Sequence, residues 1–385
     1  MTTTALCNGR ILTDDGFLER HVVLLEQGWI RAVISESSSW RAEQTVDLRG
    51  QLLLPGFIDT QVNGGGGVLF NDDPSVDSII EIGRAHRRYG TVGFLPTLIS
   101  DDLHVVSRAV HAVQAAIERG VPGVLGIHIE GPFLNAERKG VHDASKLRWL
   151  DEDGIGLLTS LRGGRTLVTL APERTTPDII RKLTQAGVIV SAGHTNATYA
   201  QIKEALAHGL TGFTHLFNAM SQLTGREPGV VGAALDDAGS WCGIIVDGHH
   251  VAPAVLRIAM RGKPRVAGSR HSRFMLVSDA MPSVGAPHKS FKLQGRPISV
   301  ADNMCVDEDG RLAGSDIDMA SAVRNAPEML DVDLAEAARM ASFNPAQFLG
   351  LGHELGRIAP GYRANLVLVD SHVNVLNTWI DGKSA

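Results

Sequence analysis

Short apolar runs that end in polar residues recur through the middle of the chain. They have the length of strands that are buried on both faces of a parallel sheet. We place eight such strands at residues 53–61, 92–98, 124–130, 166–171, 188–193, 212–216, 242–246 and 274–278. Segments with helical spacing separate them and end at glycine, as in ATYAQIKEALAHG. Eight strand and helix units in succession predict an α/β fold of the TIM (β/α)8 barrel type.

The two ends of the chain follow a different pattern. Residues 1–50 and 355–380 contain short apolar runs separated by turn residues, without helical spacing. We assign both ends to one small β-sandwich domain, which would bring the termini together. The predicted division is 1–52 and 351–385 for the small domain and 53–350 for the barrel.

Composition narrows the classes of function. The 385 residues are 44% hydrophobic and carry a formal net charge of -6, with basic and acidic residues well mixed. No basic tract offers a surface for nucleic acid, and no apolar run approaches the ~18 residues of a membrane span. Cys7, Cys242 and Cys305 lie far apart and form no CxxC pair, which fits a reducing compartment. We therefore expect a cytoplasmic protein without nucleic-acid or membrane partners.

Three residues at predicted strand ends suggest a metal site. Glu130 in GIHIEGPF, His194 in SAGHT and His215 in FTHLFNAM each follow a separate apolar run. The active sites of such barrels lie at the carboxyl ends of the strands. A single histidine beside glycine is usually a hydrogen-bonded loop residue, and Glu130 alone could be a helix cap or an ion-pair partner. Their shared position favours a catalytic divalent metal, because three protein ligands leave a coordination position open.

Asp279, in MLVSDAM after the eighth run, is placed to act as general base and proton donor. Its alternative role, as an N-cap of the following segment, is compatible with that function. His142, Arg226 and His250 fall in glycine-bearing loops where side chains can converge on a ligand. Each of these three, taken singly, fits a solvated surface residue at least as well. GxSxG and Cys-His nucleophile signatures are absent from the sequence.

Several blocks closely resemble the N-acetylglucosamine-6-phosphate deacetylases of the amidohydrolase superfamily. In chain order they are GFIDTQVNGGGG (56–67), HIEGPFLNAERKGVH (128–142), GHT (193–195), THLFNAM (214–220), VDGHHV (246–251), SDAM (278–281) and GRIAPGYRANLVLVD (356–370). The resemblance covers nearly the whole chain. It implies that Glu130, His194 and His215 hold one divalent metal per subunit, with zinc expected and iron or another divalent metal as alternatives.

The resemblance also implies roles for the remaining residues. Asp279 becomes the proton shuttle, and His142 orients or polarises the acetyl carbonyl. The sugar phosphate would be bound by residues from several loops, namely Val141, His142, Asn218, Ala219, Arg226, His250, Leu312, Ala313 and Gly314. The resemblance further implies a homodimer in which Arg226 reaches across the interface.

The sequence departs from the wider superfamily at two places. Many members have His-x-His after the first strand and a bridging lysine after the fourth, and these residues support two metals. Here Gln61-Val62-Asn63 and Glu173 stand at those positions. Amide side chains are poor substitutes for imidazole ligands, so we predict one catalytic metal, with a weak second site left open.

The predicted activity is hydrolysis of N-acetyl-D-glucosamine 6-phosphate to D-glucosamine 6-phosphate and acetate by metal-activated water. A deacetylase for the galacto epimer, N-acetylgalactosamine 6-phosphate, is the nearest alternative. A cyclic-amide hydrolase on the same barrel is a second alternative, which the Gln-x-Asn pair and the missing lysine disfavour. A catalytically inactive sugar-phosphate sensor is a third, and the presence of Glu130, His194, His215 and Asp279 argues against it.

Overall fold

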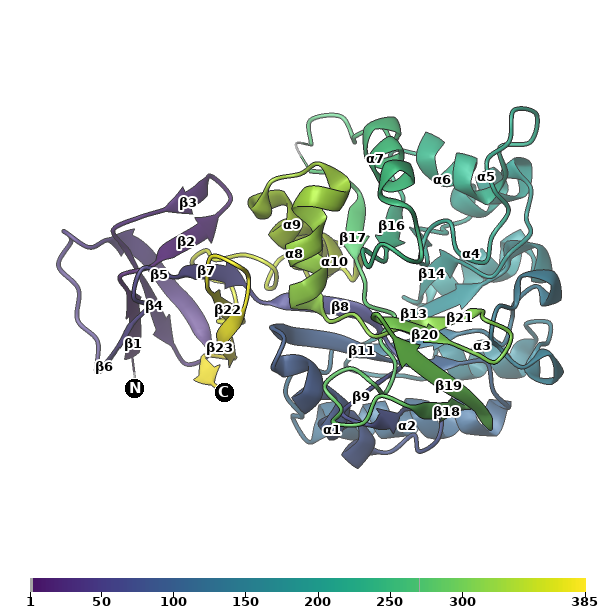
Figure 1. The fold of residues 1–385 in the computed structure, drawn as a ribbon, viewed down its shortest axis with the longest axis horizontal. Helices are drawn as coiled ribbons and strands as arrows, with labels where there is room; N and C mark the ends of the chain where they lie inside the picture. The colour runs from purple at the N-terminus through teal and green to yellow at the C-terminus, as the bar shows by residue number, and fades with distance from the viewer. Residues whose placement is uncertain (1–2, 270) are drawn as a thin grey trace.

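The computed structural model describes residues 3–269 and 271–385. Eight strands in the middle of the chain form one parallel sheet whose spatial order follows the chain. The order is β17-β16-β15-β14-β13-β12-β11-β8. Their bounds are β8 (Phe57–Val62), β11 (Thr91–Ile99), β12 (Gly126–Glu130), β13 (Arg165–Leu170), β14 (Ile189–Ala192), β15 (Gly212–Phe213), β16 (Trp241–Ile244) and β17 (Phe274–Leu276). The predicted barrel is confirmed (Figure 1).

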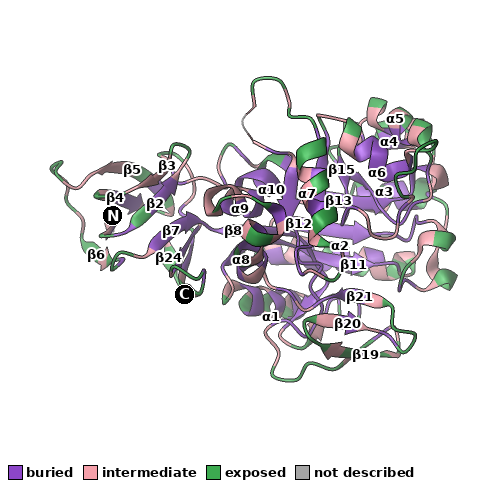
Figure 2. Ribbon diagram, turned by 45° about the horizontal axis from the view of Figure 1, so that its top comes forward, coloured by how far each residue is buried: buried purple, intermediate pink, exposed green. Residues whose placement is uncertain are grey.

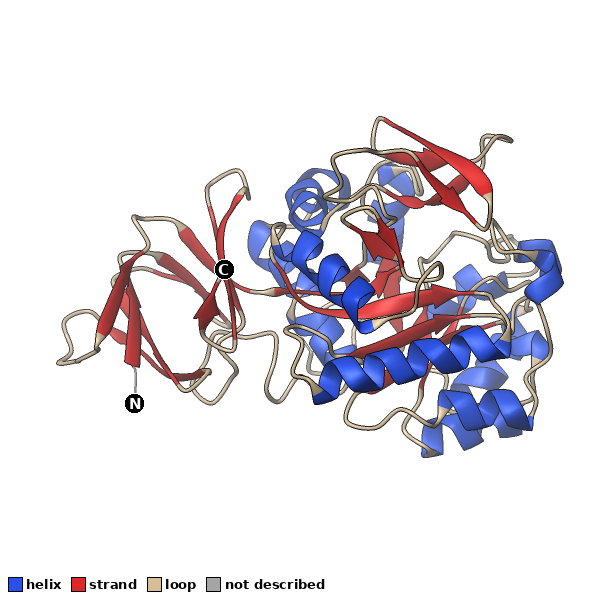
Figure 3. Ribbon diagram, turned by 90° about the horizontal axis from the view of Figure 1, so that it is seen from below, coloured by secondary structure: helices blue, strands red, loops and turns tan. Residues whose placement is uncertain are grey.

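Helices surround this sheet and explain why its strands are apolar on both faces (Figures 2 and 3). They are α1 (Val76–Arg87), α2 (Leu103–Glu118), α3 (Glu152–Leu158), α4 (Pro177–Gln185), α5 (Tyr199–Ala207), α6 (Gly229–Asp236), α7 (Pro253–Gly262), α8 (Met319–Leu330), α9 (Leu334–Ala341) and α10 (Phe343–Phe348), with short 3-10 turns η1 (Ala136–Arg138), η2 (Ala144–Lys146) and η3 (Pro172–Arg174). Local sequence sets their ends. Thr198 and Gln201 form a capping box that begins α5.

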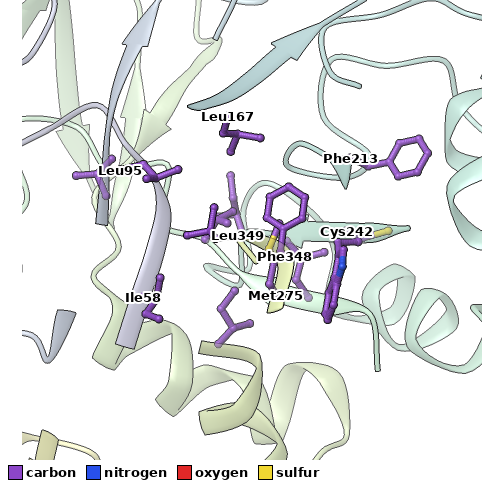
Figure 4. Close-up of a cluster of buried hydrophobic side chains, with 14 of the residues drawn as sticks. Ile58, Leu95, Leu167, Phe213, Cys242, Met275, Phe348 and Leu349 are labelled. Atoms are coloured by element: carbon purple, nitrogen blue, oxygen red, sulfur yellow. The ribbon is translucent and has the colours of Figure 1, made fainter. Parts of the chain in front are cut away.

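Side chains fill the inside of the barrel. Figure 4 shows Ile58, Leu95, Leu167, Phe213, Cys242, Met275, Phe348 and Leu349, all of which belong to the main buried cluster. Phe348 comes from α10, so this short helix contributes to the same core as the strands. The inside of the barrel is therefore a packed core, as in barrels of this type generally, whose active sites lie beyond the carboxyl ends of the strands.

Both ends of the chain form the small β domain, at the left of Figure 1. A four-stranded sheet, β5-β4-β1-β6, comprises β1 (Thr3–Cys7), β4 (His21–Glu26), β5 (Trp29–Ser35) and β6 (Gln44–Asp47). A six-stranded sheet, β24-β23-β22-β7-β2-β3, comprises β2 (Arg10–Thr13), β3 (Gly16–Leu18), β7 (Leu52–Pro55), β22 (Leu366–Val369), β23 (Val375–Ile380) and β24 (Lys383–Ser384). Leu6, Val23, Leu53, Leu366 and Trp379 share one buried cluster, which joins the two sheets as a sandwich.

The predicted strand at 53–61 is a correction, because it is two strands in two different sheets. β7 pairs with β2 and β22 in the small domain, whereas β8 pairs with β11 in the barrel. Gly56 separates them, and a Cβ atom there would lie 2.2 Å from Cγ2 of Val92. Both halves are buried, so the hydrophobic pattern does not reveal the change of sheet. The division at residues 52/53 and 350/351 stays a prediction.

A further antiparallel sheet was not predicted. It comprises β18 (Phe291–Leu293), β19 (Arg296–Ala301), β20 (Met304–Val306) and β21 (Leu312–Ser315), and lies between β17 and α8 in the chain (Figure 1). A small hairpin of β9 (Gly64–Gly65) and β10 (Val68–Leu69) follows β8. The Ser315 N–H donates to the Asp279 carbonyl at 2.9 Å, and the Met281 N–H donates to the Ser315 carbonyl at 3.0 Å. These bonds fix β21 beside the segment that follows β17.

Side chains and one bridge join the first and last barrel strands. The Asp59 carboxylate accepts hydrogen bonds from the Ser278 hydroxyl and, at 3.3 Å, from the Ser278 N–H. Val62 and Ala280 form an isolated parallel bridge above them. Asp59 therefore ties the seam of the barrel from inside. Within the described residues, no helix has the length and apolar character needed to cross a bilayer.

Candidate metal centre and active site

Glu130, His194 and His215 meet at the carboxyl end of the barrel, as the sequence predicts for residues at strand ends. Glu130 is the last residue of β12, and the two histidines follow β14 and β15. Glu130 Oε1 lies 3.2 Å from His194 Nε2 and 3.0 Å from His215 Nε2, and the two Nε2 atoms are 3.1 Å apart. All three side chains are buried.

The chemistry of these donors fits a divalent metal. His194 Nδ1 lies 2.9 Å from the Arg138 carbonyl, which can only accept, so the proton is on Nδ1 and the lone pair of Nε2 faces the cluster. A carboxylate and two imidazole nitrogens, all within 4.8 Å of one another, form a three-ligand set of catalytic type. The backbones of both histidines are left-handed, with φ of 48° for His194 and 31° for His215, a conformation concentrated at functional sites.

The Glu130 carboxyl is held in its charged form. Burial by itself raises its pKa, but the imidazoles of His194 and His215, whose Nε2 atoms lie 3.2 and 3.0 Å from Oε1, outweigh burial and hold the pKa well below its usual value. For His215 the directions are reversed. Burial by itself lowers its pKa, but the contact with Glu130 and the charge of Glu130 outweigh burial and raise the pKa. A negative charge therefore persists in a buried place and requires a positive partner.

Asp279 lies beside this cluster and is bound by two amides. Its Oδ1 accepts hydrogen bonds from Gln61 Nε2 at 3.0 Å and from Asn63 Nδ2 at 2.7 Å. No described residue donates a hydrogen bond to its Oδ2. Burial raises the pKa of Asp279 to about 6, and the charge of Glu130 acts in the same direction. Such a carboxyl can both take and return a proton near neutral pH.

Gln61 stands between the two acidic side chains. Its Nε2 lies 3.1 and 3.2 Å from the two Glu130 oxygens, in addition to its contact with Asp279. A neutral amide thus separates the carboxylates on the side where other superfamily members place imidazoles. This contact supports the prediction of a single metal, with Gln61 and Asn63 serving as hydrogen-bond donors.

The hydrogen bonds of His142 define its tautomer. The Ser100 N–H donates to His142 Nδ1 at 3.2 Å, and the Ser100 hydroxyl lies 2.7 Å from the same atom. A backbone N–H cannot accept, so Nδ1 is unprotonated and the neutral ring carries its proton on Nε2. Burial lowers the pKa of His142 to about 3. His142 is consequently a neutral hydrogen-bond donor in this site.

His250 is oriented by a buried carboxylate. Its Nδ1 lies 2.6 Å from Asp247 Oδ2, and Asp247 Oδ1 accepts from the backbone N–H groups of His249 and His250. Burial alone raises the pKa of Asp247, but the hydrogen bond from His250 outweighs it and lowers the pKa. The Nδ1 proton is therefore directed at Asp247, which leaves Nε2 for a ligand.

A cavity of about 300 Å³ opens over the cluster. The predicted residues that line it are Glu130, Val141, His142, His194, His215, Asn218, Ala219, His250, Asp279, Leu312 and Gly314. Residues not predicted as site residues also line it, namely Asn63, Ile99, Glu137, Arg138, Gly140 and Met281. Most of these residues lie within or next to the motifs quoted above, so their proximity to those motifs was the signal that could have identified them.

Two predicted residues do not line this cavity. Arg226 is exposed on the loop before α6. Ala313 is fully buried in the cluster beneath the β18–β21 sheet. The alternation of a strand explains the second case, because Leu312 and Gly314 face one side of β21 and Ala313 faces the other.

Comparison with known proteins agrees with the fold. The profile of the amidohydrolase family matches residues 52–385. An N-acetylgalactosamine-6-phosphate deacetylase from Shewanella sp. (strain ANA-3) is 41% identical, with 97% of this chain and 94% of the relative covered. An N-acetylglucosamine-6-phosphate deacetylase from Haemophilus influenzae is 36% identical, with 98% of both chains covered.

Solved structures give the same result. The crystal structure of N-acetylglucosamine-6-phosphate deacetylase from Pasteurella multocida has a TM-score of 0.94 and 35% identity, and the match covers 100% of this chain and 99% of that one. The chain therefore belongs to the amidohydrolase family. The curated relatives and the solved structure named above are all deacetylases of amino-sugar 6-phosphates.

Proposed function

We propose that this protein hydrolyses N-acetyl-D-glucosamine 6-phosphate to D-glucosamine 6-phosphate and acetate. The observation that carries the proposal is the buried cluster of Glu130, His194 and His215 with Asp279 beside it in one cavity. The relatives named for this activity support the choice of substrate. We also propose a cytoplasmic location, consistent with an intracellular sugar phosphate as substrate.

Glu130, His194 and His215 would hold one divalent metal, with zinc expected and iron or another divalent ion as alternatives. When bound, such an ion lowers the pKa of water and polarises a carbonyl group. Asp279 accepts the proton of the attacking water and returns it to the amide nitrogen as the C–N bond breaks. The products are then acetate and a free amine, and no covalent enzyme intermediate is needed.

His142 complements this proton transfer. Its Nε2–H, fixed by the two contacts of Nδ1 with Ser100, can donate to the oxygen of the acetyl carbonyl as negative charge develops there. Because burial holds its pKa at about 3, His142 stays neutral across the working pH range. We assign the role of base to Asp279 and the role of donor to His142.

Phosphate recognition would use other residues of the same cavity. Asn218, Ala219 and His250 line it, and we propose that they contact the sugar phosphate. Arg226 does not line the cavity of its own chain, although its fork of donors suits a phosphate group. We propose a homodimer in which Arg226 of each subunit completes the site of the other.

The galacto epimer is a second candidate substrate. The relative from Shewanella, at 41% identity, is named for N-acetylgalactosamine 6-phosphate, whereas the Haemophilus relative at 36% identity is named for the gluco epimer. The two sugars differ in the configuration of one ring hydroxyl. The metal site, Asp279 and His142 would serve both, so only contacts to the ring would discriminate.

The test is acetate release by zinc-loaded protein from both epimeric 6-phosphates and from unphosphorylated N-acetylglucosamine. We expect turnover of the gluco 6-phosphate and a much lower kcat/KM for the sugar without phosphate, because distant phosphate contacts position the amide. A clear preference for the galacto sugar would identify it as the substrate and would leave the proposed mechanism unchanged. Inactivity on both phosphates by protein that contains metal would contradict the proposal.

A further inference from the structure

Glu173 occupies the position where other superfamily members carry a bridging lysine, yet it is no part of the cluster. It lies on η3, directly after β13, and is half-buried. It is absent from the lining of the cavity and from the ligand group of Glu130, His194 and His215. Its carboxylate therefore has a role other than that of the lysine.

Three neutral groups donate to this carboxylate. Asn135 Nδ2 lies 2.8 Å and the Asn196 N–H nitrogen 2.6 Å from Oε1, and Thr195 Oγ1 lies 2.5 Å from Oε2. Among the described residues, no lysine or arginine forms an ion pair with Glu173. Hydrogen bonds to an ionised acceptor are roughly twice as strong as neutral ones. Glu173 thus binds two loops through charge-assisted hydrogen bonds.

Both loops position His194. Thr195 and Asn196 follow it directly in the chain. Asn135 comes from the loop after β12, and its N–H donates to the His194 carbonyl at 2.9 Å. The same loop supplies the Arg138 carbonyl that receives the Nδ1 proton of His194. The Glu173 carboxylate therefore binds the two segments that set the backbone and the ring orientation of this histidine.

The conformation of His194 requires such support. Its φ of 48° is left-handed, which a residue with a side chain adopts only where the surroundings hold it. Thr195 is fully buried, and its N–H donates to the Ala219 carbonyl at 3.1 Å. Without Glu173, the Thr195 hydroxyl and the Asn196 N–H would lose their acceptor, and this segment could relax.

We propose that Glu173 is a positioning residue that ties the loop after β12 to the loop after β14 and thereby presents His194 Nε2 to the metal. The inference rests on the proposed metal centre. Hydrogen-bond partners of this kind, one step removed from the metal, typically change metal affinity about 10- to 100-fold when they are lost.

The test measures zinc affinity directly, by competition with a chromogenic chelator, in Glu173→Ala, Glu173→Gln and wild-type protein. We expect about 10- to 100-fold weaker binding in the alanine variant. Glutamine keeps one oxygen for the two amide donors, and the Thr195 hydroxyl can turn to accept from the new amide, so we expect it to restore most of the affinity.

Glu336→Ala is the matched control. Glu336 is also half-buried and accepts a hydrogen bond from Ser272 Oγ at 2.9 Å, but it does not line the cavity. A merely structural loss would lower the melting temperature in both alanine variants and change zinc affinity in neither. Weaker zinc binding in Glu173→Ala alone supports the positioning role, and unchanged affinity there overturns it.

Hydrogen exchange of the metal-free proteins gives a second readout. We expect faster exchange at residues 193–197 in Glu173→Ala than in wild type, because these amides belong to the segment that Glu173 holds. Thr195→Val, which removes a single donor, provides the same comparison if the alanine variant does not fold. Equal exchange in wild type and variants would contradict the inference, whereas a wild-type protein that binds no zinc would contradict the proposed function as well.

Discussion

The two sides of the active-site cavity present opposite chemistry. On the side of β12, β14 and β15, the cluster of Glu130, His194 and His215 gathers lone pairs within hydrogen-bond distance of one another. On the side of β8 and β17, Gln61 and Asn63 present amide N–H groups to Asp279. The ligand atoms of the first side can bind a cation. On the second side, neutral amide groups already donate hydrogen bonds to Asp279.

This difference predicts separate tasks for the two sides of the cavity. In the proposed mechanism, the lone-pair side would hold the metal, and the amide side would orient Asp279 as the proton carrier. Because the amides donate only to Oδ1, the other oxygen of Asp279 stays available for a water proton. Variants on the two sides should therefore fail in different ways, and that distinction can be tested.

The largest effect is expected on the lone-pair side. His194→Ala removes one of three ligands, so metal content should fall and acetate release should drop to background, at least about a thousandfold below wild type. Chelation of the wild-type protein should do the same, and added zinc should restore the wild type only. Full activity in a metal-free sample would contradict the proposal that this side of the cavity acts through a bound metal.

On the opposite side, Asp279→Asn should lower kcat by about 10²- to 10⁴-fold while the metal stays bound. Asparagine keeps the size of the side chain but cannot take a proton from water. Metal content measured by elemental analysis separates this variant from His194→Ala. If Asp279→Asn also lost its metal, Asp279 would have to be counted among the ligands.

A smaller effect is expected for Asn63→Ala. The lost hydrogen bond to a charged group corresponds to about 10- to 100-fold in kcat/KM, with metal content unchanged. The Asn63 amide lowers the pKa of Asp279, so its removal should raise that pKa and shift the acid limb of the rate profile to higher pH. A pH profile identical to that of wild type would show that Asn63 does not act through Asp279.

Much of this site could be predicted from sequence, because barrel strands are readable as apolar runs and catalytic groups follow them. Glu130, His194, His215 and Asp279 each stand at such a place. Chain order in a barrel is also spatial order, so residues after separate runs had to converge. The convergence of these four residues was predictable for this reason.

Other features depend on contacts that leave no local pattern. The change of sheet at Gly56 occurs inside one buried run, and the β18–β21 sheet is an insertion between barrel elements. Ala313 faces away from the cavity because of strand alternation, which needs the strand register to be known. The role of Glu173 depends on donors from two other loops.

The remaining effect is on stability rather than on catalysis, beneath the amide side, where Asp59 joins β8 to Ser278 and accepts the Gln61 N–H at 3.2 Å. Burial raises the pKa of Asp59 from 3.8 to about 7. The folded protein thus binds this proton more tightly than the unfolded chain does. The resulting stabilisation is complete below about pH 4 and is lost as the pH rises through 7.

Asp59→Asn keeps an acceptor for the Gln61 N–H and does not ionise, so it should escape this loss. Relative to wild type, the variant should gain roughly 2–3 kcal/mol in free energy of unfolding between pH 5 and pH 8. Melting temperatures of both zinc-loaded proteins across this range measure the gain. A constant difference would contradict the predicted titration of Asp59 near pH 7 and its contribution to the pH dependence of stability.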